Sequence, residues 1–136
     1  MKFNKDPRHL ARKIALNYVY SNLISAKIPN IDYIIVNLGA ENYNTELFNK
    51  IIKLYYENKD LLDEKVNPFL VNWNREQLLD LDILIIKIAV LEVLIGKFTP
   101  VKVAVDEAVE LAKEFGSEKS GKFVNGVLAK LIEQEK

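Results

Sequence analysis

Two phenylalanines and two lysines near the C-terminal end of the chain have the types and spacing of an RNA-binding surface. Phe115 and Phe123 bracket residues 116–122, which include Lys119 and Lys122. Aromatic rings stack on unpaired bases and ammonium groups neutralise phosphates, so this combination suits single-stranded RNA. Asn125 could read a base edge or cap a backbone group. The same spacing equally suits two aromatic side chains that pack in a core, and both interpretations stay open.

A second basic cluster lies near the start of the chain. Residues 1–30 carry six Lys and Arg against Asp6 alone, a net charge of +5, whereas the whole chain is formally neutral. Arg8 and Arg12 are four residues apart, so on a helix they share a face and could grip a phosphate backbone together. The alternative is a solvated first helical turn without a ligand.

The sequence offers no set of residues for catalysis. Residues 116–122 read GSEKSGK and match the first seven positions of the phosphate-loop pattern GxxxxGK[ST], but Phe123 stands where the hydroxyl is needed. A helix is also expected before this loop, where the motif needs a strand. His9 is the only histidine and cysteine is absent, so we predict neither a metal site nor a disulfide. We expect a protein that is not an enzyme and that holds no cofactor.

The apolar segment Ile83–Ile95 is expected to be the element around which the other helices pack. Eleven of its thirteen residues are apolar. Isoleucine and valine favour strands, but buried strands run about 4–8 residues, and a membrane span needs about 18 or more apolar residues. The segment therefore predicts a central buried helix, capped by Asp82 and ended by Gly96.

Further helices are predicted around this one. Five Gly and four Pro leave little material for a turn-rich β architecture, so the chain is expected to be one all-α domain over residues 1–136. Trp73 is expected to be a core anchor. The basic start lacks the apolar run of a secretory signal, and a cytoplasmic protein is expected. The first predicted helix begins at Pro7, behind Asp6, the second spans 31–38, the third begins at Asn44 and the fourth spans 61–66. A further turn or two is predicted over 74–81, ahead of the central helix. After it, one helix is predicted from Thr99 to Gly116 and a last one from Ser117 or Ser120 onward.

Four stretches together resemble one known family. Residues 103–131, VAVDEAVELAKEFGSEKSGKFVNGVLAKL, resemble the C-terminal signature of the NusB transcription antitermination family. Residues 81–94, 10–20 and 61–73 are similar to its central helix, its first helix and the segment before the central helix. The resemblance implies an all-α, NusB-like fold of about seven helices in two small bundles, with no catalysis.

The resemblance also implies partners. NusB-like proteins pair with NusE, a ribosomal protein of the small subunit, and the pair binds boxA RNA, notably in ribosomal RNA leaders. It then joins the elongating RNA polymerase with other Nus factors and suppresses premature termination. A membrane is not among the implied partners.

The family's site residues map onto positions of this chain. The resemblance implies RNA contacts by Arg8, Arg12, Phe115, Lys119, Lys122, Phe123 and Asn125. It implies a partner surface that includes Tyr20, Asp82 and Lys87. Two other hypotheses stay open: a helical protein-binding scaffold without RNA contact, motivated by net neutrality and the sparse arginines, and an accessory domain of an RNA methyltransferase.

Overall fold

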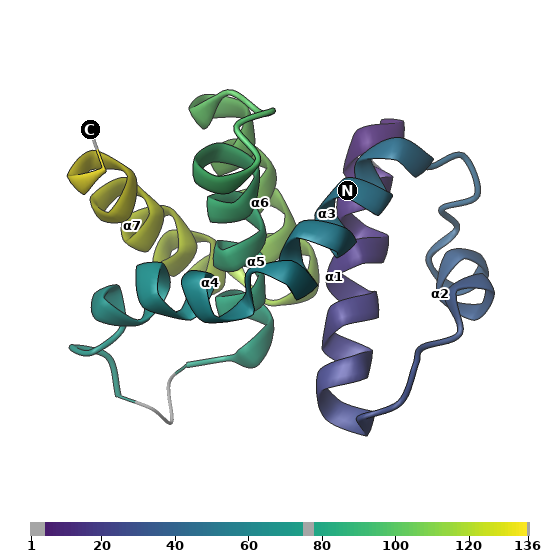
Figure 1. The fold of residues 1–136 in the computed structure, drawn as a ribbon, viewed down its shortest axis with the longest axis horizontal. Coiled ribbons are helices and arrows are strands. Elements are labelled where there is room, and N and C mark those ends of the chain that lie inside the picture. The colour runs from purple at the N-terminus through teal and green to yellow at the C-terminus, as the bar shows by residue number, and fades with distance from the viewer. Residues whose placement is uncertain (1–4, 75–77, 136) are drawn as a thin grey trace. The chain divides into compact units, whose positions relative to one another are not determined.

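The computed structural model describes residues 5–74 and 78–135, and within these residues it contains helices and connections but no strand (Figure 1). The all-α prediction is confirmed. A short 3-10 turn spans Asn67–Phe69, and a π-helical turn spans Leu91–Ile95. The α-helices are α1 Pro7–Ser25, α2 Ile31–Leu38, α3 Thr45–Glu57, α4 Lys59–Val66, α5 Asp80–Val90, α6 Val101–Phe115 and α7 Glu118–Gln134.

The chain divides into two compact units, Met1–Lys53 and Leu54–Lys136. The first unit holds α1 and α2, which pack on one another. The second holds α4 to α7, and α3 runs across the boundary. A single domain over residues 1–136 stays a prediction.

The helix starts follow local capping signals, as predicted for α1 and α7. The Asp6 carboxylate accepts a hydrogen bond of 2.9 Å from the backbone N–H of Arg8 at the start of α1. The Ser117 hydroxyl accepts one of 3.3 Å from the N–H of Ser120 at the start of α7. Asn30 caps α2 in the same way. Each side chain satisfies a donor that the first helical turn leaves without a backbone partner.

The apolar segment forms the core of the second unit, as predicted. Helix α5 continues into the π-helical turn, and Gly96 follows its last residue. The segment packs against α4, α6 and α7, and Ile85, Ile86 and Leu91 are almost completely buried. Of the helical turns predicted over 74–81, residues 75–77 lie outside the described residues, and residues 78–79 are not helical.

Two predictions about single residues in this unit are wrong. Asp82 does not cap the central helix, because α5 already begins at Asp80 and Leu79 occupies the capping position. Trp73 is not a core anchor, since 44% of its surface is exposed. Among the described residues, none of the helices has the length and apolar character needed to cross a membrane.

Gly96 provides a test of packing at the end of the central segment. A Cβ atom there would overlap the ring of Phe98 and lie 2.9 Å from Cδ1 of Leu54. Overpacking of this kind costs about 1–3 kcal/mol. We therefore expect Gly96→Ala to lower the free energy of unfolding by about that amount, as measured by urea denaturation.

Gly126 is the matched control for this substitution. It lies inside α7, and a Cβ atom there would meet nothing within 4 Å. Alanine costs less conformational entropy than glycine in a helix, so Gly126→Ala should raise stability by about 0.5–1 kcal/mol. Equal effects of the two substitutions would contradict the crowding at Gly96.

Candidate nucleic-acid interface

The predicted C-terminal surface lies where α6 ends and α7 begins. Phe115 is the last residue of α6 and is partly buried. Lys119 and Lys122 are exposed on the first turns of α7, and Asn125 is exposed one turn later. The structure therefore places these polar side chains on one helix, where they can meet a ligand together.

Small residues bring α6 and α7 close to one another. Ala104, Ala108 and Ala112 form a buried stripe on α6, and Gly121 is buried on α7. A Cβ atom at Gly121 would lie 2.9 Å from Cγ of Lys113, so the lysine stem crosses directly over the glycine. The small side chains of these alanines and the absence of a side chain at Gly121 therefore allow α6 and α7 to pack closely.

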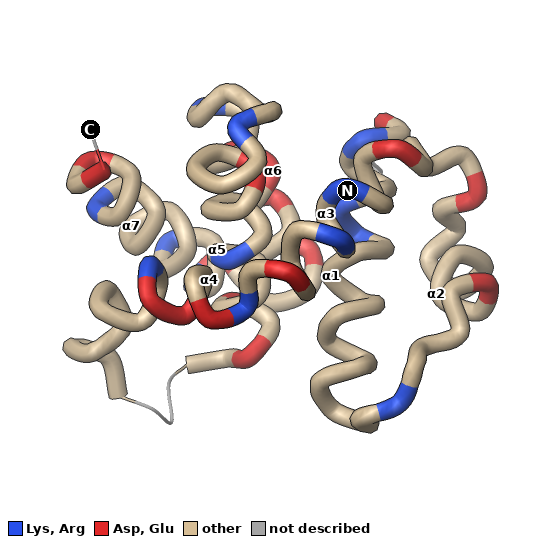
Figure 2. Tube along the Cα trace, in the orientation of Figure 1, with Lys and Arg blue, Asp and Glu red and all other residues tan. Residues whose placement is uncertain are grey.

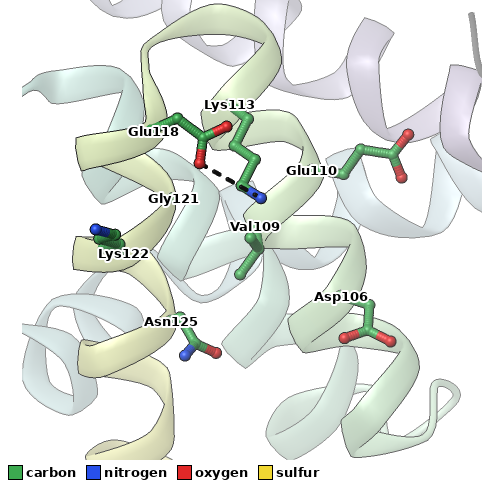
Figure 3. Close-up of a pocket in the computed structure, with 8 residues that line it drawn as sticks. All are labelled: Asp106, Val109, Glu110, Lys113, Glu118, Gly121, Lys122 and Asn125. Atoms are coloured by element: carbon green, nitrogen blue, oxygen red, sulfur yellow. Dashed lines mark ion pairs between the residues drawn. The ribbon is translucent and has the colours of Figure 1, made fainter. Parts of the chain in front are cut away.

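A shallow groove of about 570 Å³ separates the outer faces of these two helices (Figure 3). Lys113 and Lys122 line it, but so do Asp106, Glu110 and Glu118, which leaves the lining with a net charge of −1. The side chains of Lys113 and Glu118 point toward one another across the groove, with Nζ and Oε2 3.7 Å apart. The groove is therefore not a basic cradle for phosphate. Positive charge available to RNA lies instead on α7 itself.

Charges of both signs are mixed along the helices of the second unit (Figure 2). Exposed ion pairs of this kind contribute little to stability and are screened by salt. The mixture of signs means that this unit offers no uniformly basic face.

Phe123 is half-buried and contacts Trp73. The two ring centroids lie 4.6 Å apart and the rings are nearly perpendicular, at 85°. Edge-to-face pairs are favoured by the charge distribution of aromatic rings. Trp73 and Phe123 are far apart in the sequence, and no sequence pattern indicated that they would meet. Phe123 is therefore neither fully buried nor fully exposed, and its stacking on RNA stays a prediction.

The two arginines of α1 differ in exposure. Arg8 is exposed on the first turn, whereas Arg12 is 3% exposed. The structure therefore does not present the two guanidinium groups side by side to solvent, and a phosphate contact by Arg12 stays a prediction. Arg8 stays a predicted phosphate contact.

Two of the three predicted partner-binding residues make side-chain contacts inside the second unit. Asp82 is 5% exposed and accepts a hydrogen bond from the side chain of Ser120 on α7. Lys87 pairs with Asp63 of α4, with Nζ and Oδ1 2.6 Å apart. These contacts hold α5 to its neighbours, and partner binding by Asp82 and Lys87 stays a prediction. Tyr20, partly exposed on α1, stays a predicted partner contact.

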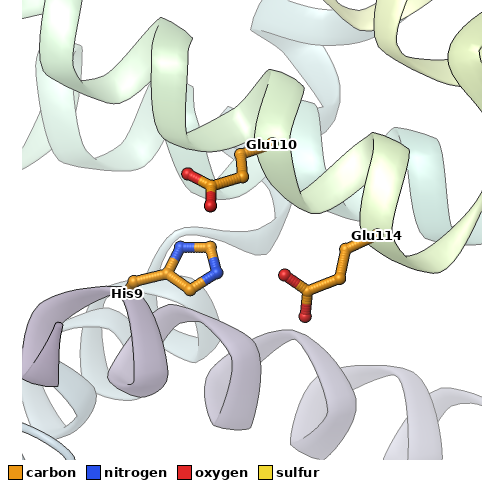
Figure 4. A group of neighbouring side chains, drawn as sticks. All are labelled: His9, Glu110 and Glu114. Atoms are coloured by element: carbon orange, nitrogen blue, oxygen red, sulfur yellow. The ribbon is translucent and has the colours of Figure 1, made fainter. Parts of the chain in front are cut away.

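Figure 4 shows Glu110 and Glu114, which lie one turn apart on α6, together with His9 of α1. His9 is fully buried. The glutamates belong to the second unit and His9 to the first, and no ion site is assigned to them.

Comparisons with known proteins agree on one family. The model of the NusB family matches residues 9–133. The transcription antitermination protein NusB of Dehalococcoides mccartyi (strain CBDB1) is 36% identical to this chain over 126 residues, which cover 90% of this chain and 87% of the relative. The protein of the same description from Bacillus licheniformis is 36% identical over 124 residues, which cover 91% and 95%.

Solved structures resemble the fold along almost its full length. T. maritima NusB aligns with a TM-score of 0.72 and 27% identity over 96% of this chain and 92% of that one. A structure of the antitermination factors NusB and NusE in complex with double-stranded RNA aligns with a TM-score of 0.73 over 93% and 96%. Its identity is 21%, so this second likeness shows the fold alone.

The buried carboxyl group of Asp82 makes stability depend on pH. Burial raises its pKa above the ordinary value of 3.8, and the hydrogen bond from Ser120 offsets part of the rise. The folded state therefore holds this proton more tightly than the unfolded state does. This contribution to stability is complete below the unfolded pKa and is lost as pH rises through the folded pKa, so ionised Asp82 costs stability at neutral pH.

We expect Asp82→Asn to raise the Tm relative to the parent protein at pH 7 and to raise it less at pH 3.5. The asparagine carbonyl can still accept the Ser120 hydrogen bond. Thermal unfolding followed by circular dichroism at both pH values measures the difference. Glu64→Gln, at an exposed position on α4, is the control and should change Tm little at either pH. A lower Tm for Asp82→Asn at pH 7 would show that the charged form stabilises the fold.

Proposed function

Because the chain belongs to the NusB family, we propose that it is a transcription antitermination factor that binds boxA RNA together with NusE. In this proposal the pair joins the RNA polymerase elongation complex with other Nus factors and supports ribosomal RNA transcription in the cytoplasm. The observation that carries it is the 36% identity to antitermination proteins over about nine-tenths of the chain. These relatives are described as transcription antitermination proteins, a description that names no enzymatic reaction and agrees with the lack of a catalytic set in the sequence.

The exposed residues of α7 support the RNA part of the proposal. Lys119, Lys122 and Asn125 offer two ammonium groups and one amide to solvent, and Phe123 lies beside them. Each lysine that neutralises a phosphate releases a counterion, so the affinity should fall as salt rises. A stacked base adds about 1–3 kcal/mol.

Two observations favour a second candidate, a protein-binding scaffold without RNA contact. Arg12 is buried, and the groove between α6 and α7 has a net negative lining. Such a protein would bind NusE and leave the affinity of NusE for RNA unchanged.

One titration separates the two functions. A labelled boxA RNA is followed by fluorescence anisotropy with this protein alone, with NusE alone and with both, at two salt concentrations. A scrambled RNA is the control. Tighter binding that is selective for boxA, requires both proteins and weakens with salt supports antitermination through RNA. Association with NusE without any gain in RNA affinity would contradict that function and support the scaffold.

The lysines of α7 should determine the salt dependence of this binding. We expect Lys122→Gln to lower the affinity for boxA RNA and for scrambled RNA alike. It should also reduce the slope of the logarithm of the association constant against the logarithm of the salt concentration by about 1, because one phosphate contact is lost. Arg8→Gln should act in the same way. Lys102→Gln, at a well-exposed position near the start of α6, is the matched control and should leave the slope unchanged. An unchanged slope for both Lys122→Gln and Arg8→Gln would remove these residues from the interface.

A further inference from the structure

Trp73 lies in a position that neither the packing of the core nor the proposed set of RNA contacts explains. It is the only tryptophan of the chain, and 44% of its surface is exposed. A large aromatic ring at the surface loses the stabilisation that burial would give. Its contact with Phe123 places it directly beside the candidate RNA surface.

We propose that Trp73 stacks on an unpaired base of the RNA and extends the interface from the start of α7 along that helix. This inference rests on the proposed function, because it assumes that the α7 surface binds RNA. The chemistry of the ligand is a single-stranded RNA segment.

The geometry of the aromatic pair leaves room for a base. In a nearly perpendicular pair the edge of one ring meets the face of the other. Phe123 can therefore cover at most one face of the Trp73 indole, and at least one face stays free of it. A base can stack on that face, since base–aromatic stacking needs only two flat surfaces and tolerates any sequence.

A groove beside Trp73 has the size and the groups for a nucleotide. Its volume is about 1020 Å³, at the upper end of the range for small-ligand sites, about 300–1,000 Å³. Pro68 and Phe69 provide an apolar wall next to the indole. The Asn72 amide can pair with a base edge, and Lys130 can meet a phosphate.

The groove is continuous with the candidate RNA surface along one face of α7. Lys119, Phe123, Gly126 and Lys130 recur at intervals of four, three and four residues, so they form one stripe on the helix. The stripe runs about 16 Å from the first lysine to the last, at 1.5 Å per residue. Gly126 in its middle has open space around it, which lets a chain approach the helix backbone.

The composition of the stripe favours RNA over a peptide as the occupant. Lysines stand at both ends, an aromatic ring lies between them, and no carboxylate occupies a stripe position. Glu133, three residues beyond Lys130 on the same face of α7, also lines the groove, so the two charged residues of the lining sum to zero. A peptide-binding groove would be expected to offer apolar pockets for side chains along its length, whereas this one combines an aromatic wall with an amide and an ammonium group.

The single tryptophan allows a direct test. Protein produced with 5-fluorotryptophan carries one fluorine nucleus, at Trp73, so its fluorine resonance reports this ring even when unlabelled NusE is present. The RNA probe is the boxA oligonucleotide used above. We expect the resonance to shift during the titration with the same midpoint as the anisotropy signal.

Substitutions separate stacking from a general structural effect. Trp73→Leu keeps an apolar side chain but removes the flat ring, and it should lower the affinity for single-stranded boxA RNA roughly tenfold. Trp73→Phe keeps a ring and should stay within about threefold of the parent protein. Duplex RNA of the same sequence offers no unstacked base, so its affinity should change less than about twofold. Val71→Ala, at an exposed neighbouring position that does not line this groove, is the control and should change nothing.

The outcomes distinguish this inference from the proposed function. If RNA binds but the fluorine resonance stays in place and Trp73→Leu has normal affinity, Trp73 is not a stacking platform, and the proposed function stands. If Trp73→Leu instead lowers the affinity of this protein for NusE in the absence of RNA, the groove is a protein-binding site and the inference is overturned. If no RNA binds with or without NusE, both fail. Should Trp73→Leu lose its helical signal on circular dichroism, Trp73→Phe and the fluorine titration decide.

Discussion

Burial of the apolar segment formed by α5 and its π-helical turn is the constraint on which the second unit depends. Residues 83–95 are apolar on nearly every side, so no side can face water without cost. Helices α4, α6 and α7 cover the segment, and each large side chain that they bury contributes about 1.5–3 kcal/mol. This gain outweighs the local preference of isoleucine and valine for strands. The requirement to cover this segment therefore determines where α4, α6 and α7 pack.

The few polar residues in this segment fix how its neighbours are placed. The Lys87 ammonium group pairs with Asp63 of α4, and the Glu92 carboxylate accepts a hydrogen bond of 2.7 Å from the Thr99 hydroxyl ahead of α6. Glu92 is 1% exposed, and a carboxylate so deeply buried is costly unless it is hydrogen-bonded. Among the described residues, no buried polar side-chain atom lacks a partner. Because each pair joins particular atoms, the two pairs favour the observed placement of α4 and of the start of α6 against the segment.

The candidate RNA surface is a consequence of that packing. The buried alanines of α6 and Gly121 of α7 let the two helices approach closely, and this sets which side of α7 faces outward. That side carries Lys119, and the chain before α5 places Trp73 against Phe123 next to it. Interfaces that stack bases need rings held in place before the ligand arrives, since ordering a loose ring on binding would cost free energy. A ring pair held by the fold meets this need, which links the core of the unit to the proposed function.

The sequence by itself determined the features that depend on neighbouring residues: the helical class, the start of α1 behind Asp6, the buried central segment and the family. Capping and periodicity act over a few residues, so they can be read along the chain. The tertiary structure alone decided the roles of Arg12 and Asp82, which are buried, and of Trp73, which is exposed. A side chain's exposure depends on which distant residues pack against it, such as Ser120 against Asp82, and no local pattern encodes that partner.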